Sequence, residues 1–77
     1  MTVMHEVEFQ FAVGEEVVVR LDQAEMRDGA ADLPSWSIGE IVERFLRSGR
    51  PSYALTVRHG DGVLTCIVAE QAIEGTA

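Results

Sequence analysis

Lysine and asparagine are absent from this chain, and cysteine occurs only once, at Cys66. A single cysteine excludes an internal disulfide framework and a zinc site built from several thiolates. No apolar run approaches the roughly 20 residues that a membrane-spanning helix needs. The N-terminus has neither the basic start nor the apolar stretch of a secretory signal, so we expect a cytoplasmic protein. Because lysine and asparagine codons are rich in A, their absence also favours a GC-rich bacterial genome as the origin.

All six basic residues are arginines, and 13 acidic residues oppose them, which gives a net charge of −7. This charge disfavours direct binding of nucleic acid and of anionic membranes, since both need basic side chains. It leaves a protein partner with a basic surface as an option. The 77 residues, 47% hydrophobic and 25% charged, predict one folded domain spanning 1–77. Within it we expect an extended N-terminal segment at 1–8 and a frayed tail at 75–77.

Alternating apolar and polar residues mark the first part of the chain. Residues 3–13 place valine and phenylalanine on one side and glutamate on the other, so we expect an extended segment with one buried face. Gly14 permits a sharp reversal. The valine-rich residues 16–21 then predict a strand. Residues 22–37 are polar and irregular, and predict a long loop that covers one end of the fold or carries its interaction surface.

Residues 38–47 fit two interpretations. Ile38, Ile41, Val42 and Phe45 lie at helical spacing, and Ser37 with Glu40 resembles a helix-capping box. A strand is favoured instead, because it allows antiparallel pairing with residues 53–57 through a turn at 48–51.

The last part of the chain is more regular. Residues 52–59 alternate, Gly60-Asp61-Gly62 is typical of a tight hairpin turn, and residues 63–68 return as the partner strand. Residues 69–72 suit a single helical turn before Ile73. The expected fold is all-β, a small barrel of about five antiparallel strands.

The order of these parts resembles that of an SH3-like barrel over residues 9–74. The resemblance rests on five motifs, namely Phe11-x-Val13-Gly14-Glu15-x-Val17-x-Val19, Gly39-x-Ile41, Tyr53-x-Leu55-x-Val57, Gly60–Gly62 and Glu70-x-x-Ile73. Leu33-Pro34-x-Trp36 before Gly39-x-Ile41 is similar to the SH3-like domain of nitrile hydratase β subunits and their small accessory relatives. The His-Thr-Arg that precedes Leu-Pro in that family is replaced here by Ala31-Asp32.

The resemblance implies a binding role without a resident cofactor. SH3-like barrels bind peptides, protein surfaces or nucleic acid through the long first loop and adjacent strands. In the nitrile hydratase relatives the metal lies in the other subunit. A groove for proline-rich peptides needs an aromatic cluster, whereas Trp36 and Tyr53 are the only aromatic residues here with a polar tip.

No motif predicts catalysis, a metal site or a cofactor site. A Cys66–His59 dyad can be drawn across the hairpin, but counting outward from Asp61 puts the two residues out of register. We expect Cys66 to be a buried thiol.

The sequence therefore predicts a non-enzymatic protein-interaction module or accessory subunit that binds through the loop 22–37 and adjacent strands. The candidate partner-binding residues are Trp36, Tyr53, Glu25, Asp28 and Asp32. The alternative is an acidic inhibitor or antirepressor that mimics nucleic acid and occupies a DNA-binding protein. Oligomeric state is left open.

Overall fold

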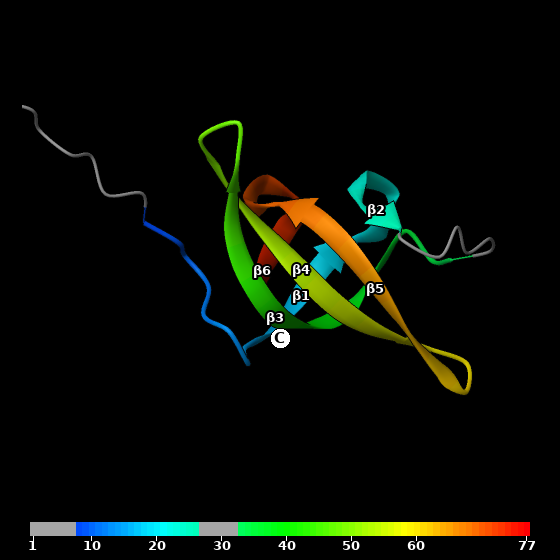
Figure 1. Cartoon of the computed structure of the whole chain (residues 1–77). Coiled ribbons are helices and arrows are strands. Elements are labelled where there is room, and N and C mark those ends of the chain that lie inside the picture. Colours follow the sequence, from blue (N-terminus) through cyan, green and yellow to red (C-terminus); the bar gives the residue numbers. More distant parts are fainter. Residues whose placement is uncertain (1–7, 27–32) are drawn as a thin grey trace, which may run out of the picture.

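Strands and single 3-10 turns are the regular elements of the computed structural model, which describes residues 8–26 and 33–77 (Figure 1). The described strands form one antiparallel sheet in the order β2-β5-β4-β3-β1-β6. Their bounds are β1 Glu16–Arg20, β2 Glu25–Met26, β3 Trp36–Arg47, β4 Arg50–His59, β5 Gly62–Ala69 and β6 Ile73–Thr76. The 3-10 turns are η1 Leu21–Gln23 and η2 Glu70–Ala72. The prediction of a small all-β domain is confirmed, including the single helical turn near the C-terminus.

The ambiguous segment 38–47 is a strand, and the helical interpretation is wrong. It lies within β3, which pairs with β4 from Gly39 opposite Val57 to Arg47 opposite Arg50. The register shifts between Ile41 and Glu43, so Val42 is an extra residue in a β-bulge. The turn that follows is tighter than the predicted 48–51.

Two two-residue turns close the hairpins of the meander β3-β4-β5. Ser48 and Gly49 have φ angles of +53° and +77°, and positive angles at both positions are typical of a type I′ turn. Between β4 and β5 the chain reverses through Gly60, with φ +61°, and Asp61, where His59 pairs with Gly62. Both turns match the right-handed twist of the strands that they join.

The C-terminal residues are part of the sheet, so the prediction of a frayed tail at 75–77 is wrong. β6 pairs with β1, with Gly75 opposite Val18 and Thr76 opposite Val17. The backbone N–H of Ala77 donates to the carbonyl oxygen of Glu16 at 3.0 Å. Backbone pairing holds these residues although their side chains are small or polar.

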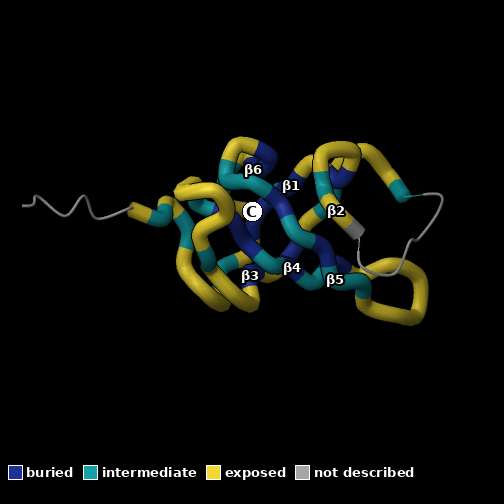
Figure 2. Tube along the Cα trace, turned by 45° about the horizontal axis from the view of Figure 1, so that its top comes forward, coloured by how far each residue is buried: buried dark blue, intermediate teal, exposed yellow. Residues whose placement is uncertain are grey.

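The buried residues come from β1, η1, β3, β4, β5 and the η2–β6 region (Figure 2). The core consists of Val17, Val19, Leu21, Ile41, Tyr53, Leu55, Val57, Cys66, Val68, Ala72 and Ile73. It includes Cys66, which is fully buried as expected. Gly39 is also buried, and a Cβ atom there would approach Val57 Cγ2 to 3.2 Å.

Residues 8–13 form no strand, contrary to the prediction for 3–13, of which 3–7 lie outside the described residues. Phe9 and Phe11 instead pack edge-to-face on Tyr53, each with its ring centroid 5.8 Å from the tyrosine ring. Side-chain oxygen atoms accept hydrogen bonds from the backbone N–H groups of this segment. In a paired strand, the carbonyl oxygens of a neighbouring strand would accept them. Glu70 Oε2 accepts from the N–H of Gln10 at 3.1 Å, and the Tyr53 hydroxyl accepts from that of Phe11 at 3.4 Å. Alternation thus predicted that the phenylalanines pack against the core, where they are partly buried, but not the lack of strand pairing.

The expected loop 22–37 contains regular structure at both ends. η1 and β2 occupy its start, and β2 pairs with β5 at Ile67 and Cys66. Trp36 and Ser37 already belong to β3 and pair with β1. The middle of the loop, 27–32, lies outside the described residues.

Candidate interaction surface

The structure describes three of the five predicted binding residues and places them in different environments. Trp36 is the first residue of β3 and is 61% exposed. Glu25 is exposed on β2, where its carboxylate pairs with Arg47 at 2.9 Å. Asp28 and Asp32 lie outside the described residues.

Tyr53 does not lie on the surface, so its assignment as a partner-binding residue is corrected. Its side chain is fully buried in the core, between the two N-terminal phenylalanine rings. The hydroxyl donates to Glu70 Oε2 at 2.6 Å. Burial and this hydrogen bond raise the pKa of Tyr53 to about 12. The polar tip that indicated a binding residue in the sequence satisfies an internal carboxylate instead.

Trp36 belongs to an open groove with both apolar and polar lining residues on the outer face of the sheet. Trp36, Ile38 and Val63 contribute exposed apolar side chains, with Ile38 49% and Val63 59% exposed. The groove measures about 810 Å³, and its wall is completed by Glu16, Pro34, Ser37, Glu40, Thr56 and Arg58. We call this set the Trp36 groove. It is the part of the described surface where a large aromatic side chain and two exposed aliphatic side chains meet.

Side-chain alternation on β3 explains why these residues face outward. Trp36, Ile38 and Glu40 are alternate residues before the bulge and therefore share one face of the strand. Ser37 and Gly39 point the other way, opposite the buried Val19 and Val17 of β1. The inner space at this point is filled by the two valines, so small residues suit the inner row of β3.

Two carboxylates stand directly opposite each other in the groove. Glu16 of β1 pairs with Glu40 of β3 in the sheet register, and both residues are exposed. Side chains at such positions have Cβ atoms about 5 Å apart, and like charges there repel. No ion pair among the described residues involves either carboxylate. Arg58, on the β4 side, is the one cationic residue in the groove wall.

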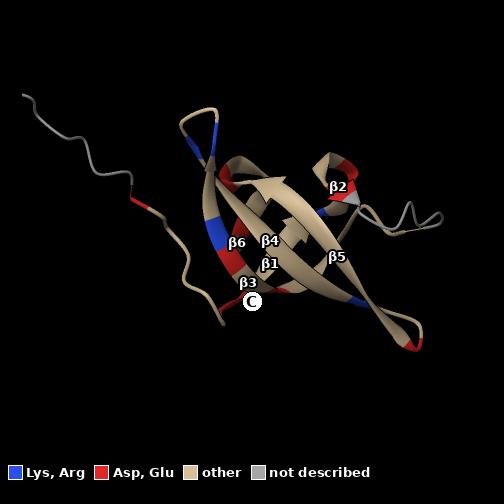
Figure 3. Ribbon diagram, viewed as in Figure 1, with Lys and Arg blue, Asp and Glu red and all other residues tan. Residues whose placement is uncertain are grey.

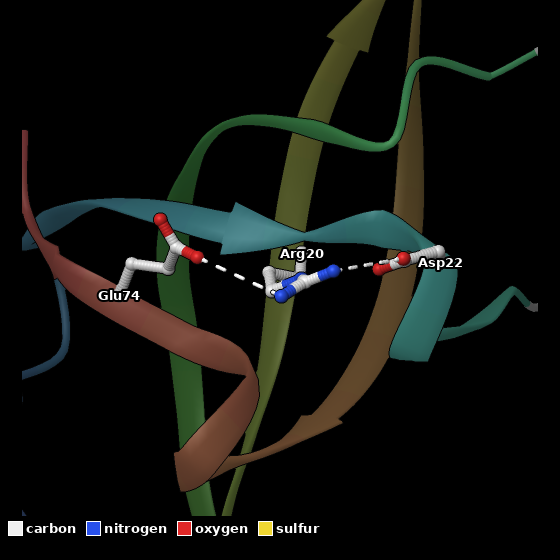
Figure 4. Close-up of polar contacts among 3 residues, drawn as sticks. All are labelled: Arg20, Asp22 and Glu74. Atoms are coloured by element: carbon white, nitrogen blue, oxygen red, sulfur yellow. Dashed lines mark hydrogen bonds and ion pairs between the residues drawn. The ribbon is translucent and has the colours of Figure 1, made fainter.

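A second arginine near the groove, Arg20, forms ion pairs with other carboxylates. Arg20 is opposite Trp36 in the register of β1 and β3. Its guanidinium lies between the carboxylates of Asp22 and Glu74, at 3.2 Å and 4.0 Å (Figure 4). The hydrogen bond and charge of Asp22, with a smaller contribution from Glu74, raise the pKa of Arg20 above its usual value. The ion pairs of Arg20 are therefore with Asp22 and Glu74, and not with Glu16 or Glu40.

The remaining polar groups form no catalytic or metal-binding constellation among the residues that the structure describes. Cys66 is opposite Leu55, whereas His59 is opposite Gly62, so the hairpin register separates the two residues of the drawn dyad. Burial raises the pKa of the Cys66 thiol to about 11, which keeps it protonated and unreactive at neutral pH. No group of three histidine, cysteine or acidic side chains is placed to hold a metal ion within residues 8–26 and 33–77.

Acidic residues occur on several parts of the molecule (Figure 3). Those in the described ranges lie in the N-terminal segment, on β1, β2, β3 and β6, in η1 and η2, and in the turn after β4. The described acidic residues are thus distributed over many elements rather than along one strand.

Ile38 and Val63 are the apolar groove residues that sequence reasoning missed, and Glu16, Glu40 and Arg58 are the charged ones. Alternation along a strand from Ile41 would have placed Ile38 on the opposite face, and alternation from Cys66 would have done the same for Val63. For Ile38 this alternation was hard to recognise, because the apolar residues at 38, 41, 42 and 45 also fit the spacing of a helix.

Comparison of the chain with protein-family models, with curated proteins and with solved structures finds no significant match. Among the described residues, no helix has the length and apolar character that crossing a bilayer requires.

Proposed function

We propose that this chain is a non-enzymatic protein-interaction module, or an accessory subunit, that binds its partner through the Trp36 groove. The observation that carries the proposal is the exposure of Trp36, Ile38 and Val63 together at one concave surface. Tryptophan is enriched among the residues that dominate binding energy at protein interfaces, where aliphatic neighbours exclude water from it. An exposed apolar patch of this kind is typical of an interaction site.

An SH3-like barrel is the architecture that we propose for the module. The order of parts supports it: a strand after the Gly14 turn, a long connection, a three-stranded meander and a 3-10 turn before the closing strand. In the SH3-like class, binding through the first long connection and the adjacent strands is common. The Trp36 groove lies where that connection enters β3.

Affinity capture at two salt concentrations tests this function. The tagged natural chain, Trp36→Ala and the control Leu46→Ala are each incubated with an extract of the source organism. Leu46 is 51% exposed on β3 but does not line the groove, so its truncation removes a comparable exposed apolar side chain elsewhere. We expect a partner retained by the natural chain and by Leu46→Ala, and lost with Trp36→Ala, at both about 0.15 M and about 0.5 M salt.

Salt dependence distinguishes this function from nucleic-acid mimicry. At about 0.5 M salt the Debye length falls to about 4 Å, which screens contacts between exposed charges but not apolar burial. A partner released by all three proteins at the higher salt concentration, and retained equally by all three at the lower, would contradict groove binding and favour the mimic.

A further inference from the structure

The charges of the Trp36 groove indicate the chemistry of its occupant, provided that the groove is the binding site proposed above. We propose that it binds an extended peptide segment in which a lysine or arginine lies four residues from a large apolar side chain. The apolar side chain covers Trp36 and Ile38, and the basic side chain lies between Glu16 and Glu40.

The opposed carboxylates are the first part of the argument. Glu16 and Glu40 face each other across β1 and β3, and no cation among the described residues forms an ion pair with them. A cation placed between two like charges relieves their repulsion and interacts with both. Arg58 lies two residues beyond Thr56, which is the β4 partner of Glu40. The groove wall therefore holds one more negative than positive side chain.

The spacing of the outer row on β3 sets the geometry of the partner. Trp36, Ile38 and Glu40 occupy alternate positions, and a strand rises about 3.3 Å per residue. Trp36 and Glu40 are thus about 13 Å apart along the strand. In an extended peptide the same distance separates residues four positions apart, on one face of the peptide.

Charge also favours a basic peptide over a second copy of this chain. Two copies placed groove to groove would bring four carboxylates together, and each copy carries a net charge of −7. A basic segment is attracted by that overall charge before it makes contact. Acidic segments are repelled by Glu16 and Glu40, and neutral segments gain no attraction between opposite charges from them.

Selection from a phage-displayed library of random dodecapeptides tests the inference. We expect the natural chain to enrich peptides with a basic residue four positions from a leucine, isoleucine, phenylalanine or tryptophan. The double variant Glu16→Lys/Glu40→Lys should enrich acidic residues at the basic position, with the apolar preference retained. Circular dichroism verifies that each variant is folded.

Titration of the chain with one enriched synthetic peptide measures how much the glutamates, Arg58 and Trp36 each contribute to binding. The fluorescence of the single tryptophan reports the binding. Glu16→Gln/Glu40→Gln, which keeps side-chain size, should weaken binding about three- to tenfold. Arg58→Gln should strengthen it about twofold, since it removes from the groove wall a positive charge that repels the basic side chain of the peptide. For Trp36→Ala, measured with a dye-labelled peptide, we expect a loss of about thirtyfold or more.

The possible failures are distinguishable. If Trp36→Ala abolishes binding but neither glutamate variant changes the selected charge, the basic partner is refuted and the groove remains the binding site. Peptides that bind the natural chain and Trp36→Ala equally, or no enrichment at all, refute the groove itself. A dimer in analytical ultracentrifugation that Trp36→Ala dissociates would identify a second copy as the occupant and overturn the peptide.

Discussion

Removing a single oxygen atom from Tyr53 tests how the N-terminal segment is attached to the sheet. Its hydroxyl donates to Glu70 Oε2 at 2.6 Å, and the same carboxylate oxygen accepts from the backbone N–H of Gln10. The substitution Tyr53→Phe keeps the ring, and with it the edge-to-face contacts to Phe9 and Phe11. It removes only the hydrogen bonds of the hydroxyl.

The magnitude follows from the charge of the acceptor. A hydrogen bond to a charged group contributes about 1.5–3 kcal/mol, and partial burial places this one near the lower end, at about 1.5–2 kcal/mol. A domain of this size has a free energy of unfolding of about 4–12 kcal/mol. For small domains each kcal/mol lowers the melting temperature by about 4–8 °C. We therefore expect Tyr53→Phe to melt about 6–16 °C below the natural chain.

A double-mutant cycle with Glu70→Ala, which removes the acceptor, separates this hydrogen bond from other effects of the substitution. Urea unfolding of the natural chain, the two single variants and the double variant yields the coupling energy of the pair. We expect a coupling of about 1 kcal/mol or more. Equal stability of Tyr53→Phe and the natural chain, or additive losses in the cycle, would refute the attachment.

The pH dependence of stability provides a second measurement on the same residue. The pKa of Tyr53 is raised from 10.0 to about 12 in the folded protein, first by burial and then by the bond to Glu70. The resulting stabilisation is complete below pH 10 and is lost as the pH rises toward 12. The stability difference between the natural chain and Tyr53→Phe should therefore shrink over this range, and in this difference the contribution of Cys66 cancels. Because Tyr53 is the only tyrosine, phenolate absorbance reports its titration directly, and a folded-state pKa near 10 would contradict the buried hydrogen bond.

Two further predictions concern buried positions of the sheet. Gly39→Ala should destabilise the fold by about 1–2 kcal/mol in urea unfolding, because the added Cβ meets Val57 Cγ2 at 3.2 Å and the Thr56 carbonyl oxygen at 3.3 Å. Gly62→Ala, whose Cβ would meet nothing closer than 3.9 Å, is the matched control, and equal losses in both variants would contradict the close approach. Cys66 should stay unmodified by Ellman's reagent in the native protein and react after denaturation, since it is fully buried with a pKa raised to about 11. Rapid native labelling would contradict its place in the core.

Much of the strand order was predictable, because turn chemistry and alternation are local signals. Gly60 and Asp61 form the expected hairpin turn, and residues 16–20 form the expected first strand. Apolar residues on both faces of β3, together with the β-bulge, explain why 38–47 was ambiguous. Ile38 lies on the outer face and Ile41 on the inner face, and the extra residue at Val42 then interrupts the period of two, so apolar residues at 38, 41, 42 and 45 have the spacing of a helix.

The role of Tyr53 depends on residues far away in the sequence and was therefore not predictable. Its hydroxyl is satisfied by Glu70, which is 17 residues away, and the rings that cover it precede it by more than 40 residues. Side-chain type alone indicates that tyrosine suits both an interface and a core. Trp36 was predicted to be a binding residue within the loop 22–37, whereas the structure makes it the first residue of β3.

The first half of β3 reverses the usual arrangement of a half-buried strand. Its large apolar side chains, Trp36 and Ile38, point to solvent, while the small Ser37 and Gly39 point toward the core. Full burial of a large apolar side chain contributes about 1.5–3 kcal/mol, and folding of the isolated chain gains only part of that at these two positions. Val17 and Val19 explain the small inner residues but not the large outer ones. Burial against a partner would supply the missing part, so the same substitution, Trp36→Ala, should cost binding while lowering the free energy of unfolding of the isolated chain by only about 1 kcal/mol, the part gained at a 61% exposed side chain.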